Sequence, residues 1–176
     1  IPFEFNITQA YVLEFGNNYI RFLKDNGQIT ETAKTISGIT AANPAVVTAT
    51  SHGYSNGDDV WIAGVVGMTR LNGRRFTVAN KTTNTFELTD ENSTSYTAWS
   101  SGGTASKTYQ ITTTYTSAEL YDLQFTQSAD VMYIVHPDHP PAKLSRTAHT
   151  TWTLADVDFQ TGPFRDTNTT ATTLTT

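Results

Sequence analysis

The abundance of threonine is the feature that most constrains the fold of this chain. Threonine is its commonest residue, with 34 copies among 176 residues, and the branched Cβ of threonine favours the extended backbone of strands. Charged residues make up only 15% of the chain, which is low for helices whose exposed faces carry ion pairs. No segment shows the sustained 3.6-residue periodicity of an amphipathic helix. The sequence therefore predicts an all-β protein.

Alternation of apolar and polar residues, broken by turn residues, predicts strands in both ends of the chain. Residues 9–15, 19–24 and 28–32 alternate in this way and form two successive hairpins. Residues 107–112 also alternate and are expected to pair with residues 28–32. The continuous apolar run at residues 131–135 predicts a strand that is buried on both faces.

Prolines are predicted to end the strand at residues 131–135. Three prolines within His136–Pro141 each lack a backbone donor, so this segment is not expected to continue a strand. Beyond it, residues 143–146 and 151–154 are predicted as the following two strands.

The composition changes at Ile36, and from there to Ser106 short strands alternate with Gly and Asn turns. Their predicted ranges are 45–49, 59–63, 75–78 and 85–88. Turn signals about every 10 residues are typical of a small barrel or sandwich. We therefore predict an antiparallel β-domain with an inserted small β-barrel. The barrel comprises residues 36–106, and residues 1–35 and 107–176 form the discontinuous host domain.

Several functional classes are disfavoured by composition. The absence of cysteine excludes disulfides and thiolate zinc sites. No apolar stretch approaches the ~20 residues that cross a membrane, and no signal peptide is visible, so a membrane partner is not expected. A net charge of −5, with Arg74–Arg75 as the one basic doublet, does not fit a sequence-specific nucleic-acid binder. The start at Ile1 and the threonine-rich end, residues 167–176, predict a piece of a longer protein.

Two groups of side chains have the functional groups that a metal site or a glycosidase site would need. One could bind a transition metal and comprises His136, Asp138, His139 and His149; the intervening prolines favour a polar turn instead. The other is the carboxylates that a glycosidase would pair, either Asp122, Asp130 and Asp138 or Glu14 and Glu31. His52 with Asp58 and Asp59 is interpreted as a turn. We expect no enzyme activity, no catalytic residue, no metal and no cofactor.

Aromatic residues with strand spacing belong to a core more often than to a binding surface. If exposed together on one face of the barrel, however, Trp61, Tyr96 and Trp99 would form a stacking platform for sugars. The alternative function is therefore a host-surface or carbohydrate-binding module carried by the inserted barrel.

Two segments of the predicted host domain resemble a family of phage virion proteins. The first is Ile1-Pro-Phe-Glu-Phe5 with residues 9–16 and 19–22, and the second is residues 120–144, which include Met132-Tyr-Ile-Val-His-Pro-Asp138. They resemble the tail tube terminal, or nozzle, proteins of short-tailed bacteriophages and their prophage relatives. The resemblance implies a structural role in tail assembly, with genome passage as a further role. It also implies partners among other copies of the chain and other tail proteins. The implied location is the virion tail, assembled in the bacterial host cytoplasm.

The middle of the chain resembles a different module. Its motifs are His52-Gly-Tyr-Ser-Asn-Gly57, Val60, Ile62, Leu71-Asn-Gly73, Phe76, Val78, Asn84 and Phe86. They are similar to a small β-barrel inserted in phage and bacterial surface proteins, and to the first catalytic-cysteine half-domain (FCCH) of ubiquitin-activating enzymes. Because the chain has no cysteine, this resemblance implies a fold and not an activity.

Overall fold

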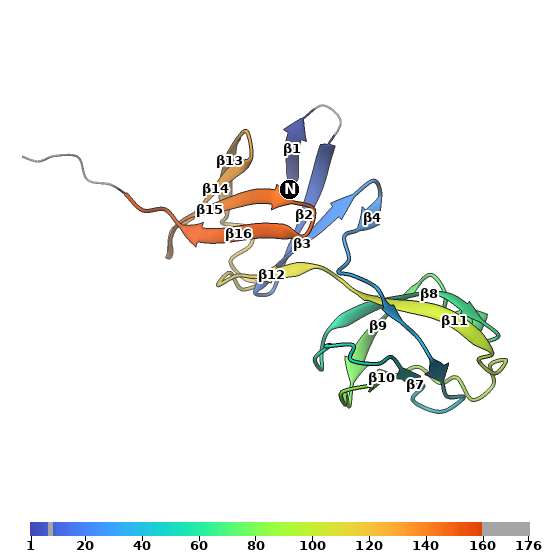
Figure 1. The fold of residues 1–176 in the computed structure, drawn as a ribbon. Coiled ribbons are helices and arrows are strands. Elements are labelled where there is room, and N and C mark those ends of the chain that lie inside the picture. The colour runs from blue at the N-terminus through green and yellow to red at the C-terminus, as the bar shows by residue number, and fades with distance from the viewer. Residues whose placement is uncertain (7–8, 160–176) are drawn as a thin grey trace, which may run out of the picture.

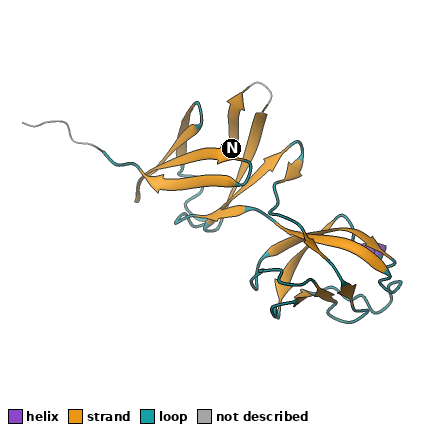
Figure 2. Cartoon of the chain, viewed as in Figure 1, coloured by secondary structure: helices purple, strands orange, loops and turns teal. Residues whose placement is uncertain are grey.

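The chain folds into strands, as its composition predicts. A computed structural model describes residues 1–6 and 9–159. Among them, regular structure consists of strands and one short 3-10 turn, η1, at Thr69–Leu71 (Figure 2). The all-β prediction is confirmed, and the sheets are antiparallel. The predicted threonine-rich end lies outside the described residues. The described part of the chain contains no helix that is long and apolar enough to span a membrane.

Two lobes are visible in Figure 1, joined by two chain crossings. The two-sheet lobe comprises residues 1–6, 9–30 and 108–159, and the barrel lobe comprises residues 31–107. In the two-sheet lobe, one sheet has the order β1-β2-β3-β12, with β4 also paired to β3, and the other has the order β13-β14-β15-β16. The strands of the first sheet are β1 Pro2–Asn6, β2 Gln9–Gly16, β3 Tyr19–Lys24, β4 Gly27–Gln28 and β12 Gln110–Thr112. Those of the second are β13 Gln124–Ser128, β14 Val131–His136, β15 His139–Ala148 and β16 Thr151–Asp156.

The core of this lobe lies between its two sheets. Alternate residues of each strand point inward, as the period of two requires, and most of those in the core are aromatic or branched. Trp152 of β16 stacks on Phe22 of β3 with ring centroids 4.3 Å apart, so the last strand packs directly on the first sheet. The buried members of the core are Phe3, Tyr11, Leu13, Ile20, Phe22, Tyr115, Met132, Ile134, Leu144 and Trp152.

The barrel lobe is a sheet that closes on itself. Its order is β5-β11-β8-β9-β10-β7-β6, and its two end strands, β5 and β6, follow each other in the chain. The backbone N–H of Ile36 donates to Gly103, while that of Ser37 donates to Thr48, so this single bent segment bridges both ends of the sheet. The strands are β5 Lys34–Thr35, β6 Gly38–Ile39, β7 Val46–Thr48, β8 Asp59–Val66, β9 Arg74–Ala79, β10 Thr85–Leu88 and β11 Ser101–Lys107.

The long connection from β10 to β11 is fixed to the barrel by a buried carboxylate. Glu91 accepts hydrogen bonds from both terminal nitrogens of Arg74, at 2.9 and 2.7 Å, and from the hydroxyl of Tyr96 at 2.7 Å. Burial acts to raise the pKa of Glu91, but these donors outweigh burial and lower it. The same connection passes so close to Gly67, at φ +89°, that an added Cβ would overlap the carbonyl oxygen of Ala98.

The two crossings between the lobes run side by side. Thr30 and Thr108 form an antiparallel bridge, and flanking backbone hydrogen bonds join Tyr109 N to Ile29 O and Glu31 N to Lys107 O, at 2.9 and 2.8 Å. The predicted pairing of residues 28–32 with the segment after 107 is therefore confirmed at the crossing. Further along, β12 pairs with β3 instead.

Two predictions about the end of the chain are wrong. In β14, buried and more exposed residues alternate, so this strand is buried on one face and not on both. The prolines do not keep the chain from forming a strand, because β15 begins at His139 and includes Pro140 and Pro141. A register shift between Ile134 and His136 places both prolines in an irregular stretch of the ladder, where a backbone donor is not needed.

Candidate functional site

The predicted histidine motif forms the turn between β14 and β15. His136 ends β14, and its Nδ1 accepts a hydrogen bond from the backbone N–H of Asp138 at 3.1 Å. His139 begins β15, with its ring 5.0 Å from that of His136. His149 lies elsewhere, where its Nδ1 is 2.7 Å from the hydroxyl of Tyr11. Within the described residues, no three His, Cys, Asp or Glu side chains converge as metal ligands.

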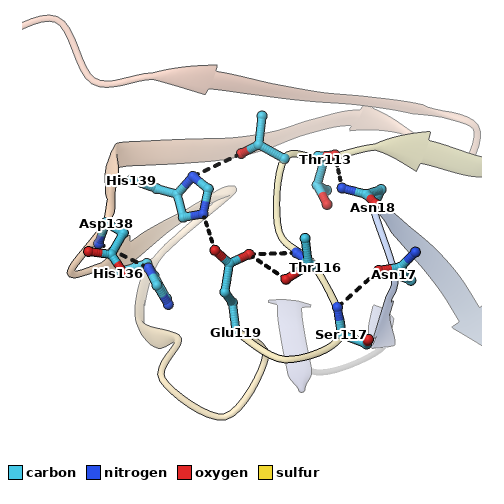
Figure 3. A network of polar contacts seen from close by, with 10 residues as sticks. Asn17, Asn18, Thr113, Thr116, Ser117, Glu119, His136, Asp138 and His139 are labelled. Carbon is cyan, nitrogen blue, oxygen red and sulfur yellow. Dashed lines mark hydrogen bonds and ion pairs between the residues drawn. The ribbon is translucent and has the colours of Figure 1, made fainter.

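His139 belongs to a polar network, shown in Figure 3, that connects it to the loop before β13. Its Nε2 lies 3.1 Å from Oε1 of Glu119. The other carboxylate oxygen of Glu119 accepts hydrogen bonds from the backbone N–H and the hydroxyl of Thr116, at 2.7 and 2.8 Å. These Thr116 donors, followed by His139, lower the pKa of Glu119 from 4.5 to about 2.

The network holds a loop in place. Thr116 and Glu119 stand in the Thr-x-x-Glu spacing of a capping box, in which the carboxylate satisfies a backbone donor at the start of a turn. The Thr114 hydroxyl is 3.3 Å from Nδ1 of His139. A hydroxyl, an imidazole and a carboxylate, those of Thr114, His139 and Glu119, are thus connected in sequence, as in a catalytic triad. That separation is long for a hydroxyl donor, and one carboxylate oxygen is already occupied by Thr116. We therefore assign the network a structural role.

The carboxylates considered for glycoside hydrolysis lie on several elements. Asp122 lies in the turn before β13. Asp130 precedes the six-residue strand β14 and Asp138 follows it, about 20 Å apart at ~3.3 Å per residue, whereas such enzymes require about 5–9.5 Å. Glu31 is 3.8 Å from Nζ of Lys107 at the crossing. Glu14 lies on β2 and accepts a hydrogen bond from Gln28.

The three predicted stacking residues are not brought together. Trp61 is on β8, with 41% of its surface exposed, and is paired in register with Ser106 of β11. Tyr96 and Trp99 lie between β10 and β11 and pack on the barrel core. The indole N–H of Trp99 donates to Gly102, four residues from Ser106 and so about 13 Å along the strand. Trp61 is therefore separate from the other two.

Trp61 instead lines a groove at the junction of the lobes. The groove has a volume of about 490 Å³. Trp61 and Arg75 come from the barrel lobe, and the other lining residues are Glu14, Leu23, Asn26, Gly27, Gln28, Thr30 and Thr108. We call this the junction groove. Sequence reasoning missed it because its walls come from strands that are far apart in the chain.

Charged side chains join the lobes beside this groove. The guanidinium of Arg21, on β3, contacts Oδ2 of Asp59, on β8, at 2.7 Å, and both side chains are largely buried. Arg21 also donates to Gln110 at 2.9 Å, and Asp59 accepts from the hydroxyl of Thr77 at 3.2 Å. Lys107 at the crossing lies 3.2 Å from Asp58. The contact between Arg21 and Asp59 joins the two walls of the groove, and the other contacts hold these two side chains and Lys107 in place within their own lobes.

The basic doublet divides between two roles, because neighbouring strand residues point to opposite sides. Arg74 pairs with buried Glu91, although 46% of the Arg74 side chain is exposed. Arg75 lies across the β8–β9 ladder from Trp61. The side chain of Arg75 makes no hydrogen bond or ion pair with the described residues.

An apolar surface covers part of the second sheet of the two-sheet lobe. Tyr133 and Val135 of β14 are 40% and 41% exposed, and Phe125 of the edge strand β13 is 46% exposed. With Gln124 and Thr126 they line a shallow depression of about 180 Å³. Tyr133 and Val135 share one face of the sheet with their ladder partners Thr126 and Gln124, whereas Phe125 is paired with the buried Ile134 and points to the other face. We call Tyr133 and Val135 the β13–β14 patch.

Comparison with known proteins concerns the barrel. Residues 42–108 match the family model described as the ubiquitin-activating enzyme E1 FCCH domain. This supports the FCCH-type β-barrel expected from the motifs at His52–Gly57 and Leu71–Gly73. No curated protein matches this chain.

Proposed function

We propose that this chain is a structural component of a bacteriophage or prophage tail, and that it acts in tail assembly through contacts between subunits. Genome passage is a further role of such an assembly. Its partners are other copies of the chain and other tail proteins, and it has no catalytic function and no sequence-specific nucleic-acid partner. Its location is the virion tail, after assembly in the bacterial host cytoplasm.

The observation that carries this proposal is the β13–β14 patch. Large apolar side chains on a sheet face are favourable only when something covers them, at about 25 cal/mol per Å² of buried apolar surface. Next to the patch, β13 is an edge strand whose outer side pairs with no other strand of the described residues. Such an edge beside exposed apolar side chains is suited to contact with a neighbouring subunit.

A second observation supports the same proposal. The two segments that resemble tail proteins, residues 1–22 and 120–144, pack into one core, where Phe3 and Leu13 belong to the first segment and Met132 and Leu144 to the second. Segments related to one family should occupy one domain, and these do. The barrel lobe protrudes from that domain through the paired crossings, as an optional insertion would.

The test is the mass of the chain in solution, measured by light scattering over a wide range of concentration. We expect a ring-sized oligomer or a mass that rises toward one. The double substitution Tyr133→Lys and Val135→Lys should leave a monomer with an unchanged circular dichroism spectrum. The matched control is Tyr121→Lys, because Tyr121 is 97% exposed on a turn outside the patch. A strict monomer at every concentration, or an oligomer that survives the double substitution, would contradict the proposed contact.

A further inference from the structure

We infer that the junction groove binds a neutral saccharide, with Trp61 as the surface on which a sugar ring stacks. This inference concerns a different surface from the β13–β14 patch and does not depend on the tail proposal. It also differs from a platform of three aromatic residues on the barrel, since Trp61 alone of the three lines the groove.

Trp61 has the exposure that a stacking residue needs. Its strand neighbours Val60 and Ile62 are fully buried, whereas Trp61 points out of the barrel with 41% of its surface exposed. The π face of an indole carries partial negative charge. The C–H groups on one face of a pyranose ring carry partial positive charge and are apolar, so they pack on such a surface. The indole N–H makes no hydrogen bond with the described residues and remains available to a ligand hydroxyl.

The polar walls of the groove match sugar hydroxyls, each of which both donates and accepts. Arg75 provides guanidinium donors with no described partner. Glu14 provides a carboxylate whose one described side-chain hydrogen bond, from Gln28 Nε2, is long at 3.3 Å. Asn26 adds an amide that both donates and accepts. Donors and acceptors thus lie around an aromatic surface.

Gln28 supplies a further acceptor. Its Oε1 is buried and accepts no hydrogen bond from the described residues, while its Nε2 donates to Glu14. A ligand hydroxyl that reached Oε1 would supply the missing donor.

Charge and size select among possible ligands. Among the described residues that line the groove, Glu14 and Arg75 are the charged ones, and their charges cancel, so a neutral ligand fits better than a phosphate or a carboxylate. A nucleic acid would require several cations along its backbone, whereas this described lining provides Arg75 alone. The volume of about 490 Å³ lies within the ~300–1,000 Å³ of small-molecule sites.

The experiment is a titration of the whole ¹⁵N-labelled chain with glucose, galactose, N-acetylglucosamine, maltose and lactose. The indole N–H signals of the three tryptophans are followed. We expect at least one sugar to shift the Trp61 signal in a saturable way while the signals of Trp99 and Trp152 stay in place. The last two report that the fold is intact, because one indole is bonded to Gly102 and the other lies in the core.

Substitutions then assign the binding to the groove. Trp61→Ala should weaken binding about tenfold or more, read from the backbone amide signals of Gly27 and Thr30 on the opposite wall. Arg75→Gln should weaken it several-fold. Tyr121→Ala, which removes an exposed aromatic residue elsewhere, should leave the affinity unchanged.

Three outcomes would overturn the inference. The first is that no sugar in the panel shifts the Trp61 signal. The second is that Trp61→Ala binds as tightly as the parent chain. The third is that N-acetyltyrosinamide shifts the Trp61 signal and the sugars do not, which would make the groove a site for a peptide side chain.

Discussion

Truncation of Trp152 should strongly destabilise the two-sheet lobe. This side chain is 5% exposed and joins the second sheet to the first. It stacks on Phe22 and meets Phe3 and Tyr11 edge-on, with centroids 4.9 and 5.3 Å away. Trp-to-Ala substitution in a core costs about 3–5 kcal/mol, and aromatic pairs add about 0.5–1.5 kcal/mol each beyond area. We expect Trp152→Ala to lower the free energy of unfolding by about 4–5 kcal/mol, against about 5–15 kcal/mol for a typical domain.

Urea unfolding followed by far-ultraviolet circular dichroism measures this loss, because the signal comes from strands in both lobes. The two cores share no described residue, so we expect Trp152→Ala to displace one part of the transition. Phe86→Ala, at a fully buried position in the barrel, is the matched control and should displace the other part. A double-mutant cycle of Trp152→Leu with Phe22→Leu should give a coupling of about 0.5–1.5 kcal/mol. A loss below about 1 kcal/mol for Trp152→Ala would refute this account of the core.

Three further predictions concern other parts of the chain. Because the pKa of Glu119 is lowered from 4.5 to about 2, its carboxylate stabilises the fold above pH 4.5 and loses that effect as the pH falls toward 2. Glu119→Gln should therefore reduce the fall in melting temperature between pH 4.5 and pH 2, and an unchanged fall would contradict this. Arg21→Ala should cost about 2–3 kcal/mol in urea, since it leaves the largely buried Asp59 without its cation; a loss no larger than that of an exposed ion pair would show that the junction contact is weak. Gly67→Ala should cost about 2–3 kcal/mol, whereas Gly57→Ala, at the same φ of +89° but with open space for a Cβ, should cost only the strain of about 1 kcal/mol; equal losses would show that overlap is not the cause.

Local patterns predicted many of the strands but not which faces they bury. The alternation at residues 9–15 and 19–24 corresponds to β2 and β3, and four predicted barrel strands match β7, β8, β9 and β10 to within a few residues. The barrel strands β5, β6 and β11 were not predicted. The apolar run at residues 131–135 predicted a strand buried on both faces, but Tyr133 and Val135 on one face are exposed. An apolar side chain looks the same in a sequence whether a sheet or a partner covers it.

The groove could not be predicted for a different reason. Trp61 was singled out from sequence, but its neighbours across the groove were not. Glu14 and Gln28 meet it only because the crossings and the contact between Arg21 and Asp59 place β8 beside the β3–β4 turn. The polar network at Glu119 left a clearer signal, since Thr116-x-x-Glu119 is a local pattern of a turn start.

The paired crossings determine how the chain carries tension. Thr30 and Thr108 are bridged, and hydrogen bonds on both sides join the outgoing and returning segments. A pull between the first and last strands of the two-sheet lobe is therefore transmitted across these hydrogen bonds, and the 77 residues of the barrel lobe between 31 and 107 stay outside the loaded path. Under such a pull, the barrel would remain folded while its host is stretched. If the crossing yields, the barrel becomes the next element in series and supplies a reserve of length.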